Sequence, residues 1–545
     1  MLKKALAAIL VFVMLVSVLS VAASALAPAA AEVKALSAEM SFSDRLSSYL
    51  YYVLDRLLNW MLSYLNLYTP KQDWVMKEDY QPVNFFEGTE AFSSTAEDGA
   101  KWYLGYSSAS LLEGQDVLDG KHYMGGSLSL LEPKVCTAVI DDQRVRTFAI
   151  SDGSDGIVCY AVLDAYALCS GDVLAIRELL KDYAAENNIV SINVGVLHQH
   201  SCIDTLGMNG ELIKALVQNP AVLSGMLDAP LHNGRNPAFM ENLHNVVADT
   251  IQNAVEDMQE GDLYYGTADA TELIKDKRYP SVIDPNLNRL RFVPKDENEE
   301  ETWVVSSGIH CVGLGAGTTE VSADYPYYLE QQLKEQTGAN LVFIQGAQLA
   351  ITTDGTTTSL EGNTRLQNVQ AYAAELARRL IGINNDELVE PLINIRLKQV
   401  YLPVENQVLT LCAHLGIFNT TVVDNGDGSF EMVSEIGYME LGDDLAFFLA
   451  PGEMAPEIAY GGAISAQDSW NGKSWNYPSM QDYIADSGRK LIVYGLMNDE
   501  VGYILTDNDY RSLFTENEEI NSSSDKAGSS VMEVFMALYD NIYAF

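Results

Sequence analysis

Residues 157–197 read IVCYAVLDAYALCSGDVLAIRELLKDYAAENNIVSINVGVL, which is an apolar run, a mixed run and a second apolar run. The outer runs, Ile157–Leu163 and Ile189–Leu197, have the length and apolar character of buried strands. The middle run, Val173–Ala185, carries apolar residues at helical spacing and is closed by two asparagines. A strand, a helix and a strand in this order predict a parallel crossover unit.

The same alternation continues along the chain. Further buried strands are predicted at Leu341–Ile344, Val408–Ala413, Leu445–Ala450 and Leu491–Tyr494, and helices near residues 237–257, 325–335, 365–382 and 527–540. Strands that alternate with helices are typical of an α/β domain, in which mixed β-sheets are flanked by helices. We find no internal repeat and no convincing linker, so one domain is expected over residues 95–545.

The composition is that of a globular protein with an acidic surface. Hydrophobic residues make up 48% of the chain, which argues against disorder despite a formal net charge of −42. That excess of acid repels phosphate backbones and anionic headgroups, so nucleic acid is excluded as a partner and any lipid contact must be mainly apolar. The six cysteines show no C-x-x-C spacing, which favours buried free thiols over a disulfide framework.

The N-terminal region predicts export. Lys3 and Lys4 precede an uncharged apolar stretch and then small residues, as in a signal peptide over residues 1–25. A secreted or extracytoplasmic protein is therefore expected, either free or associated with the cell envelope. Residues 42–68 carry apolar side chains at three- and four-residue steps, which predicts an amphipathic helix that packs on the domain, tethers it or makes peripheral membrane contact.

Two of the seven histidines, His198 and His200, end an apolar run in the string Val-Gly-Val-Leu-His-Gln-His-Ser-Cys. Alternate residues of an extended chain point to one side, so both imidazoles are expected to face one space. That space lies at the carboxyl end of a strand, where open α/β sheets usually have their sites. A metal ion fits this pattern, and the alternative is a pair of hydrogen-bonded structural histidines.

Three further segments carry polar side chains directly after an apolar run. His310 follows Trp303–Val305, Glu453 follows a hydrophobic strand and a Pro-Gly turn, and the string Asn498–Tyr503 follows another predicted strand. Each has an alternative as a structural residue or a surface turn. The sequence contains no nucleophile elbow, no H-E-x-x-H pair and no phosphate loop. Without a nucleophile elbow, no motif supports a serine-triad hydrolase.

Taken in order, these strings resemble the catalytic domain of neutral, non-lysosomal ceramidases from about residue 102 to about residue 510. The motifs that carry the resemblance are the H-x-H-S string at His198, Asp276-Lys-Arg278-Tyr-Pro280, His310 with Ser322-Ala-Asp324, Pro451-Gly-Glu453, and Asn498–Tyr503. The resemblance implies an α/β catalytic domain that hydrolyses the amide bond of an N-acylated lipid such as ceramide.

The same resemblance implies a zinc site and roles for its residues. The ligands expected for one Zn²⁺ ion are two imidazoles, a carboxylate and a phenolate, from His198, His310, Glu453 and Tyr503. Such an ion polarises the amide carbonyl and activates water. His200 is expected to transfer protons or hold the substrate, and Arg278 to bind polar or developing negative charge.

The sequence also departs from the family pattern. The family string T-H-T-H-S-G reads Leu197-His-Gln-His-Ser-Cys202 here, which changes the groups around both histidines. Thr352 stands where the family has a serine in a G-D-V-S-P string, so this catalytic candidate keeps a hydroxyl but adds a methyl group. Phe514 lies close to where the family has a further substrate-side tyrosine. The chain ends soon after the last motif, so the family's C-terminal β-sandwich domain is expected to be absent.

Three functions are consistent with these residues. The leading hypothesis is hydrolysis of ceramide to sphingosine and a fatty acid, because all four ligand positions are filled. The same amidase chemistry could act on a different N-acyl substrate. A catalytically impaired homologue that only binds lipid is the third, because of the changes around Thr352.

Overall fold

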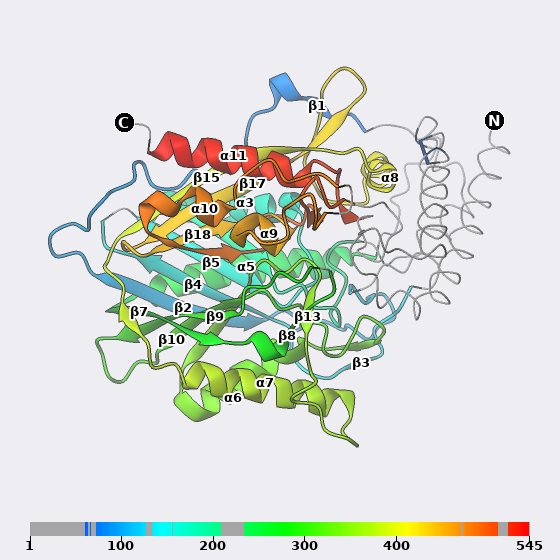
Figure 1. Cartoon of the computed structure of the whole chain (residues 1–545). Helices are drawn as coiled ribbons and strands as arrows, with labels where there is room; N and C mark the ends of the chain where they lie inside the picture. The colour runs from blue at the N-terminus through cyan, green and yellow to red at the C-terminus, as the bar shows by residue number, and fades with distance from the viewer. Residues whose placement is uncertain are drawn as a thin grey trace.

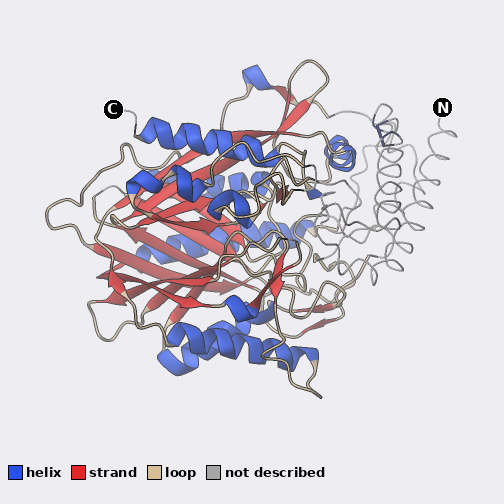
Figure 2. Cartoon of the chain, viewed as in Figure 1, coloured by secondary structure: helices blue, strands red, loops and turns tan. Residues whose placement is uncertain are grey.

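The computed structural model describes residues 60, 62–63, 66 and 72–543, apart from 127–132, 155, 208, 210–233, 279, 470–471 and 511–520. The predicted signal peptide and most of the predicted helix over 42–68 lie outside the described residues. Two mixed sheets pack against each other, and helices cover their outer faces (Figure 1 and Figure 2). None of the described helices combines the length and the apolar character needed to cross a bilayer.

The larger sheet has the order β12-β10-β9-β7-β2-β4-β5-β6, with β14 beside β7. Its nine strands are β2 (Trp102–Ser110), β4 (Arg144–Ser151), β5 (Ile157–Leu163), β6 (Ile189–Val196), β7 (Gln259–Asp269), β9 (Asn286–Pro294), β10 (Thr302–Ser307), β12 (Asn340–Gln345) and β14 (Glu387–Leu388). The outermost pairs, β5 with β6 and β10 with β12, are parallel, and the pairs between them are antiparallel.

The smaller sheet is built around the long strand β17, which pairs with β15 on one side and with β16 and β18 on the other. Its six strands are β1 (Val75–Met76), β15 (Ile393–Pro403), β16 (Val422–Asp424), β17 (Phe430–Leu441), β18 (Leu445–Leu449) and β20 (Lys490–Tyr494). Three short ladders complete the strands: β3 (Ala138–Val139) with β11 (Glu320–Val321), β8 (Ile274–Asp276) with β13 (Ile351–Thr353), and β19 (Glu453–Met454) with β21 (Tyr503–Ile504).

Helices cover both outer faces of this pair of sheets. They are α3 (Ser170–Glu186), α5 (Pro237–Glu256), α6 (Asp324–Thr337), α7 (Arg365–Ile381), α8 (Gln407–Leu415), α9 (Pro456–Tyr460), α10 (Met480–Tyr483) and α11 (Ala527–Ile542). Three short 3-10 turns lie at Lys77–Asp79, Thr271–Leu273 and Ala485–Ser487. Helices α3 and α5 pack on the larger sheet, whereas α9, α10 and α11 pack on the smaller one.

Strand alternation explains why each sheet is buried on both faces. In β5, even-numbered residues such as Tyr160 enter the core between the sheets, whereas odd-numbered residues such as Cys159 pack under α3 and α5. In β18, Phe447 faces the other sheet, and Phe448 faces α11, where its ring centroid lies 5.4 Å from that of Phe535. Strands buried on both faces read as continuous apolar runs, which is the pattern in the sequence.

The predicted α/β class with mixed sheets and flanking helices is confirmed. The crossover predicted from residues 157–197 is present, because β5, α3 and β6 follow one another and β5 lies parallel to β6. All six cysteines are free, and five of them are buried, as their apolar surroundings predict.

The strand predicted at Val408–Ala413 is wrong, because these residues form helix α8. Asn406 caps its first turn by accepting hydrogen bonds from the backbone N–H groups of Val408 and Leu409. Gly416, with φ of 64°, ends it in a left-handed conformation. A short apolar run has no periodicity that separates a strand from a helix, so only these caps reveal the difference.

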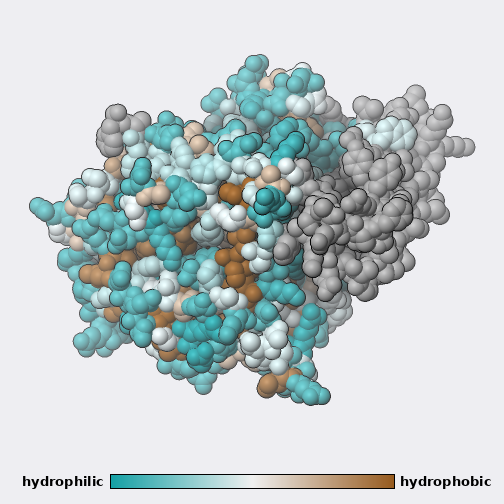
Figure 3. All heavy atoms as spheres, viewed as in Figure 1, coloured by the Kyte–Doolittle hydropathy of each residue, from teal (hydrophilic) through white to brown (hydrophobic). Residues whose placement is uncertain are grey.

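The surface agrees with the acidic composition. The face in Figure 3 is mainly hydrophilic, and apolar residues reach it only in narrow strips. Large hydrophobic side chains exposed by more than half, such as Leu360 and Leu388, belong to different segments. Scattered apolar residues of this kind are normal for a folded protein.

Candidate metal site

The carboxyl ends of three parallel strand pairs meet in one region: β5 with β6, β10 with β12, and β18 with β20. Gln345, the last residue of β12, joins the ends of β6 and β10. Its side-chain Nε2 donates to the carbonyl oxygens of Leu197 at 3.0 Å and Ile309 at 2.9 Å. The backbone N–H of Gly495, just after β20, donates to the carbonyl of Gln345 at 2.8 Å. Segments far apart in sequence therefore end beside one another.

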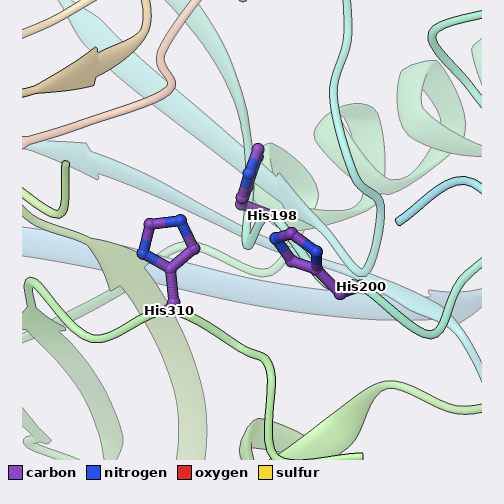
Figure 4. A group of neighbouring side chains, drawn as sticks. All are labelled: His198, His200 and His310. Atoms are coloured by element: carbon purple, nitrogen blue, oxygen red, sulfur yellow. The ribbon is translucent and has the colours of Figure 1, made fainter. Parts of the chain in front are cut away.

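Three histidine side chains converge at these strand ends (Figure 4). The ring centroid of His198 lies 5.0 Å from that of His200 and 5.2 Å from that of His310. One ring nitrogen from each residue lies within 4.8 Å of the others, so the group could hold a metal ion. His198 and His200 share one space, as their spacing predicts, although β6 ends at Val196 and His198 has φ of 56° instead of an extended backbone.

Backbone carbonyls fix which nitrogen of two of these rings carries a proton. Nδ1 of His198 lies 2.9 Å from the carbonyl oxygen of Tyr166, and Nδ1 of His310 lies 2.6 Å from that of Ile351. A carbonyl oxygen only accepts, so each Nδ1 must donate, and in the neutral ring each Nε2 has a lone pair. Metal-ligating histidines almost always have this second hydrogen bond. His198 and His310 therefore have the arrangement of Nε2 ligands.

Glu453 contacts both of these Nε2 atoms. Its Oε1 lies 3.3 Å from Nε2 of His198, and its Oε2 lies 2.8 Å from Nε2 of His310. The carboxyl is buried, which favours its neutral form, but positive charge on the two imidazoles outweighs burial and lowers the pKa of Glu453 below its usual value. Glu453 is therefore a carboxylate as long as a positive charge lies beside it.

This arrangement calls for a cation between the groups. Burial lowers the pKa of His198 to about 4, so its ring is neutral near pH 7 and presents a lone pair to a carboxylate oxygen. Two electron-rich atoms at that distance repel unless a proton or a metal ion lies between them. The distance of 3.3 Å between Nε2 of His198 and Oε1 is compatible with two atoms bound to one cation, whereas the 2.8 Å contact of Oε2 with His310 has the length of a hydrogen bond.

Tyr503 lies beside Glu453 in the ladder formed by β19 and β21. The two strands are parallel, with Glu453 opposite Tyr503. Opposite residues of neighbouring strands project from the same face, so the phenol and the carboxylate leave this ladder on one side. Tyr503 is also buried. The four predicted ligands therefore come from neighbouring strand ends.

His200 differs from the other two histidines. Both of its ring nitrogens are shielded from solvent, and the backbone of Gly126 gives them a contact too poorly aligned for a regular hydrogen bond. Burial, reinforced by the neighbouring imidazoles, lowers the pKa of His200 well below its usual value. Its ring is therefore neutral, with one nitrogen available as an acceptor and the other as a donor.

Backbone strain is concentrated around the site. Four non-glycine residues next to it have a left-handed backbone: His198 with φ of 56°, Ala350 with 60°, Leu496 with 56° and Asn498 with 66°. Each such conformation costs about 1–3 kcal/mol and persists only where the surroundings enforce it. A hydrogen bond helps to hold Asn498 in this conformation, because its Oδ1 accepts from the backbone N–H of Val194 at 2.9 Å.

Arg278 and Thr352 lie on the short ladder of β8 and β13 or directly after it. The guanidinium of Arg278 is buried and forms ion pairs with Glu457, at 2.9 Å, and with Asp509. Its charge is therefore already balanced by protein carboxylates, and a role toward substrate stays a prediction. Thr352 is half-buried and follows Ile351, whose carbonyl holds His310. Its predicted catalytic role also stays a prediction.

Glu500 is a further site residue, with a buried side chain, that the sequence pattern does not single out. Its Oε2 lies 3.8 Å from Nδ1 of His198, and its Oε1 accepts from the N–H of Gly502 at 3.0 Å. Burial, reinforced by the charge of Glu453, raises the pKa of Glu500 well above its usual value. Its place in the string Asn498–Tyr503 is the available signal, but an acidic residue in a turn is usually solvated.

A cavity of about 250 Å³ opens onto His198, Glu453 and Glu500. Most of its wall is apolar, and much of it is supplied by Trp74, Val404, Leu409, Ala413, Phe418 and Met432. Among the described residues that line it, there is no lysine or arginine. The cavity therefore suits an uncharged, apolar group that reaches His198 and Glu453.

Comparison with known proteins shows which solved structures have a similar fold. No protein-family model matches the sequence, and no curated protein matches it. The crystal structure of neutral ceramidase from Pseudomonas aeruginosa is similar, with a TM-score of 0.61 and 15% identity over 81% of this chain and 74% of that chain. A structure of ceramidase complexed with C2 has a TM-score of 0.59 and 14% identity, over 81% and 76%. This protein therefore has a fold like that of neutral ceramidases.

Proposed function

We propose that this protein is a secreted, zinc-dependent amidase that hydrolyses an N-acyl lipid amide such as ceramide to sphingosine and a fatty acid. The observation that carries the proposal is the contact of one buried carboxylate, Glu453, with Nε2 of both His198 and His310. The similarity in fold to neutral ceramidases supports the same class of reaction.

The chain's own residues fit a zinc ion. His198, His310, Glu453 and Tyr503 would hold it, since they offer nitrogen and oxygen donors at neighbouring strand ends. The chemistry that zinc supplies in such sites is polarisation of a carbonyl group and activation of water near neutral pH. The hydrogen bonds from Nδ1 of both histidines to backbone carbonyls would orient the rings and keep the Nε2 lone pairs directed at the ion.

The remaining side chains would bind the substrate and move protons. The apolar cavity would hold the acyl chain and exclude water from the amide. His200, neutral and beside the two ligand histidines, would accept a proton from the attacking water and return it to the leaving amine. A carboxylate inside the cavity would meet Glu453 and Glu500 and no described cation, which favours a neutral lipid amide over an N-acyl amino acid.

Purified protein incubated with a panel of N-acyl lipids, with and without a chelator, tests this proposal. We expect cleavage of ceramide that the chelator abolishes and that added Zn²⁺ restores. Cleavage of another N-acyl amide alone would keep the amidase and change the substrate. Binding of lipid without any product would contradict the proposed activity and favour the impaired homologue.

Filling the cavity should discriminate against long acyl chains. Ala413→Phe on α8 adds a ring to the cavity wall, so kcat/KM for a long-chain amide should fall about tenfold or more, because each displaced methylene group costs binding energy. The measurement compares kcat/KM for long-chain and two-carbon amides, with Ala413→Ser as the control of similar volume. An equal loss for both substrates would show that the cavity does not hold the chain.

A further inference from the structure

Gln199, the residue between the two histidines of the H-x-H string, is completely buried and uses both protons of its amide group. Its Nε2 donates to Oδ1 of Asp164 at 2.8 Å and to the carbonyl oxygen of Ala323 at 2.8 Å. Asp164 directly follows β5, and Ala323 directly precedes α6. One side chain therefore ties the histidine turn to two separate elements.

Asp164 is itself held in place by charge. Its Oδ2 lies 2.8 Å from the guanidinium of Arg146 in β4 and accepts from the backbone N–H of Arg144 at 2.9 Å. The guanidinium of Arg146 also contacts Glu330 of α6 at 2.6 Å. Asp164 and Arg146 are both buried. Because charge-assisted bonds between buried groups are strong and directional, this chain of contacts makes a stiff support.

Backbone hydrogen bonds attach the histidine turn to the same residues after β5. The carbonyl of Leu163 accepts from the N–H of Leu197 at 3.0 Å, and the carbonyl of Ala165 accepts from the N–H of Gln199 at 3.1 Å. The next carbonyl, of Tyr166, accepts from Nδ1 of His198. The backbone at the end of β5 therefore binds the histidine turn through hydrogen bonds, and the side chain of Gln199 adds a further bond to Asp164.

We propose that Gln199 is a positioning residue that sets the separation of His198 and His200, anchored through Asp164 and Arg146 to Glu330. The inference rests on the zinc site of the proposed function and deepens it. With His198 at a strained backbone angle, φ of 56°, the turn needs such an anchor to keep its Nε2 directed at Glu453. Gln199 touches neither substrate nor metal in this role and acts through the two histidines.

The test is the zinc affinity of Gln199→Met, measured by competition with a chelator of known affinity. Methionine keeps the length and volume of the side chain but donates no hydrogen bond. We expect the Kd for zinc to rise about 10–100-fold, as is typical when a supporting partner of a metal ligand is lost. The visible spectrum of the Co²⁺-loaded variant should also shift, because it reports the ligand geometry.

Thr250→Val is the matched control. It removes a buried hydrogen bond between Thr147 of β4 and Thr250 of α5, at 3.1 Å, on the face of the sheet that α5 covers. This variant should lower the melting temperature and leave the Kd for zinc and the Co²⁺ spectrum unchanged. Stability and metal affinity are thereby separated.

The outcomes distinguish this inference from the proposed function. If the unaltered protein binds no zinc, both are overturned. If it binds zinc and folded Gln199→Met binds equally well, only the positioning role is overturned. Should Gln199→Met fail to fold, Glu330→Gln decides, because it loosens the anchor at its partly exposed end. Weaker zinc binding in Glu330→Gln supports the anchor, and an unchanged Kd overturns it.

Discussion

Glu453→Gln is expected to remove zinc from the protein and to lower amide hydrolysis at least about 1000-fold, which corresponds to about 4 kcal/mol of transition-state stabilisation. The reason lies in the contacts of the carboxylate with two Nε2 lone pairs. A glutamine amide would direct N–H protons toward an imidazole lone pair and satisfy it without a metal. The change keeps the size of the side chain and removes the need for a cation.

Zinc content by elemental analysis and kcat/KM for ceramide measure this effect. Glu301→Gln is the control, because it also removes a carboxylate from an ion pair, with Arg291 at 2.5 Å. Glu301 immediately precedes β10, whereas the site lies beyond the other end of that strand. Full zinc occupancy in Glu453→Gln would contradict the ligand assignment, whatever the activity.

His200→Ala is expected to keep zinc and lower kcat about 100–10,000-fold, the usual contribution of a general acid or base. Glu453 contacts His198 and His310, and each of these rings has a carbonyl partner for Nδ1. His200 has only a poorly aligned contact with the backbone of Gly126 among the described residues, so it lacks the well-formed second bond that orients a ligand histidine. Its position in the three-histidine group suits proton transfer better.

The measurement is zinc content together with the pH dependence of kcat. His122→Ala is the control, because it removes another buried imidazole, which pairs with Asp119 at 3.0 Å and is absent from the three-histidine group. Loss of zinc from His200→Ala, with His122→Ala unaffected, would instead make His200 a ligand. An unchanged kcat would exclude it from the reaction.

The sequence predicts the strand ends that carry the site better than the contacts between its side chains. Continuous apolar runs predict buried strands, so the strand ends that carry His198, His310 and Glu453 follow from periodicity and turns. The carbonyls of Tyr166 and Ile351, which fix the tautomers, leave no trace in sequence because every residue has a carbonyl. They are brought to the histidines by tertiary structure alone.

The burial of charged side chains is equally hard to read from sequence. The family resemblance implies that Arg278 binds the substrate, but two distant carboxylates, Glu457 and Asp509, pair with it in the fold. The sequence around Glu500 is typical of a solvated turn, but its side chain is buried beside His198. In both cases the partner is decided by contacts between residues far apart in the chain, which local patterns do not contain.

The ladder of β19 and β21 determines when, during synthesis of the chain, all four predicted ligands are present. Its second strand begins at Tyr503, more than 300 residues after His198, so the pocket for the ion is complete only after nearly all of the described chain has been synthesised. A metal ion held by these four residues would therefore be loaded late in biosynthesis, and chains that end before Tyr503 are expected to bind metal poorly.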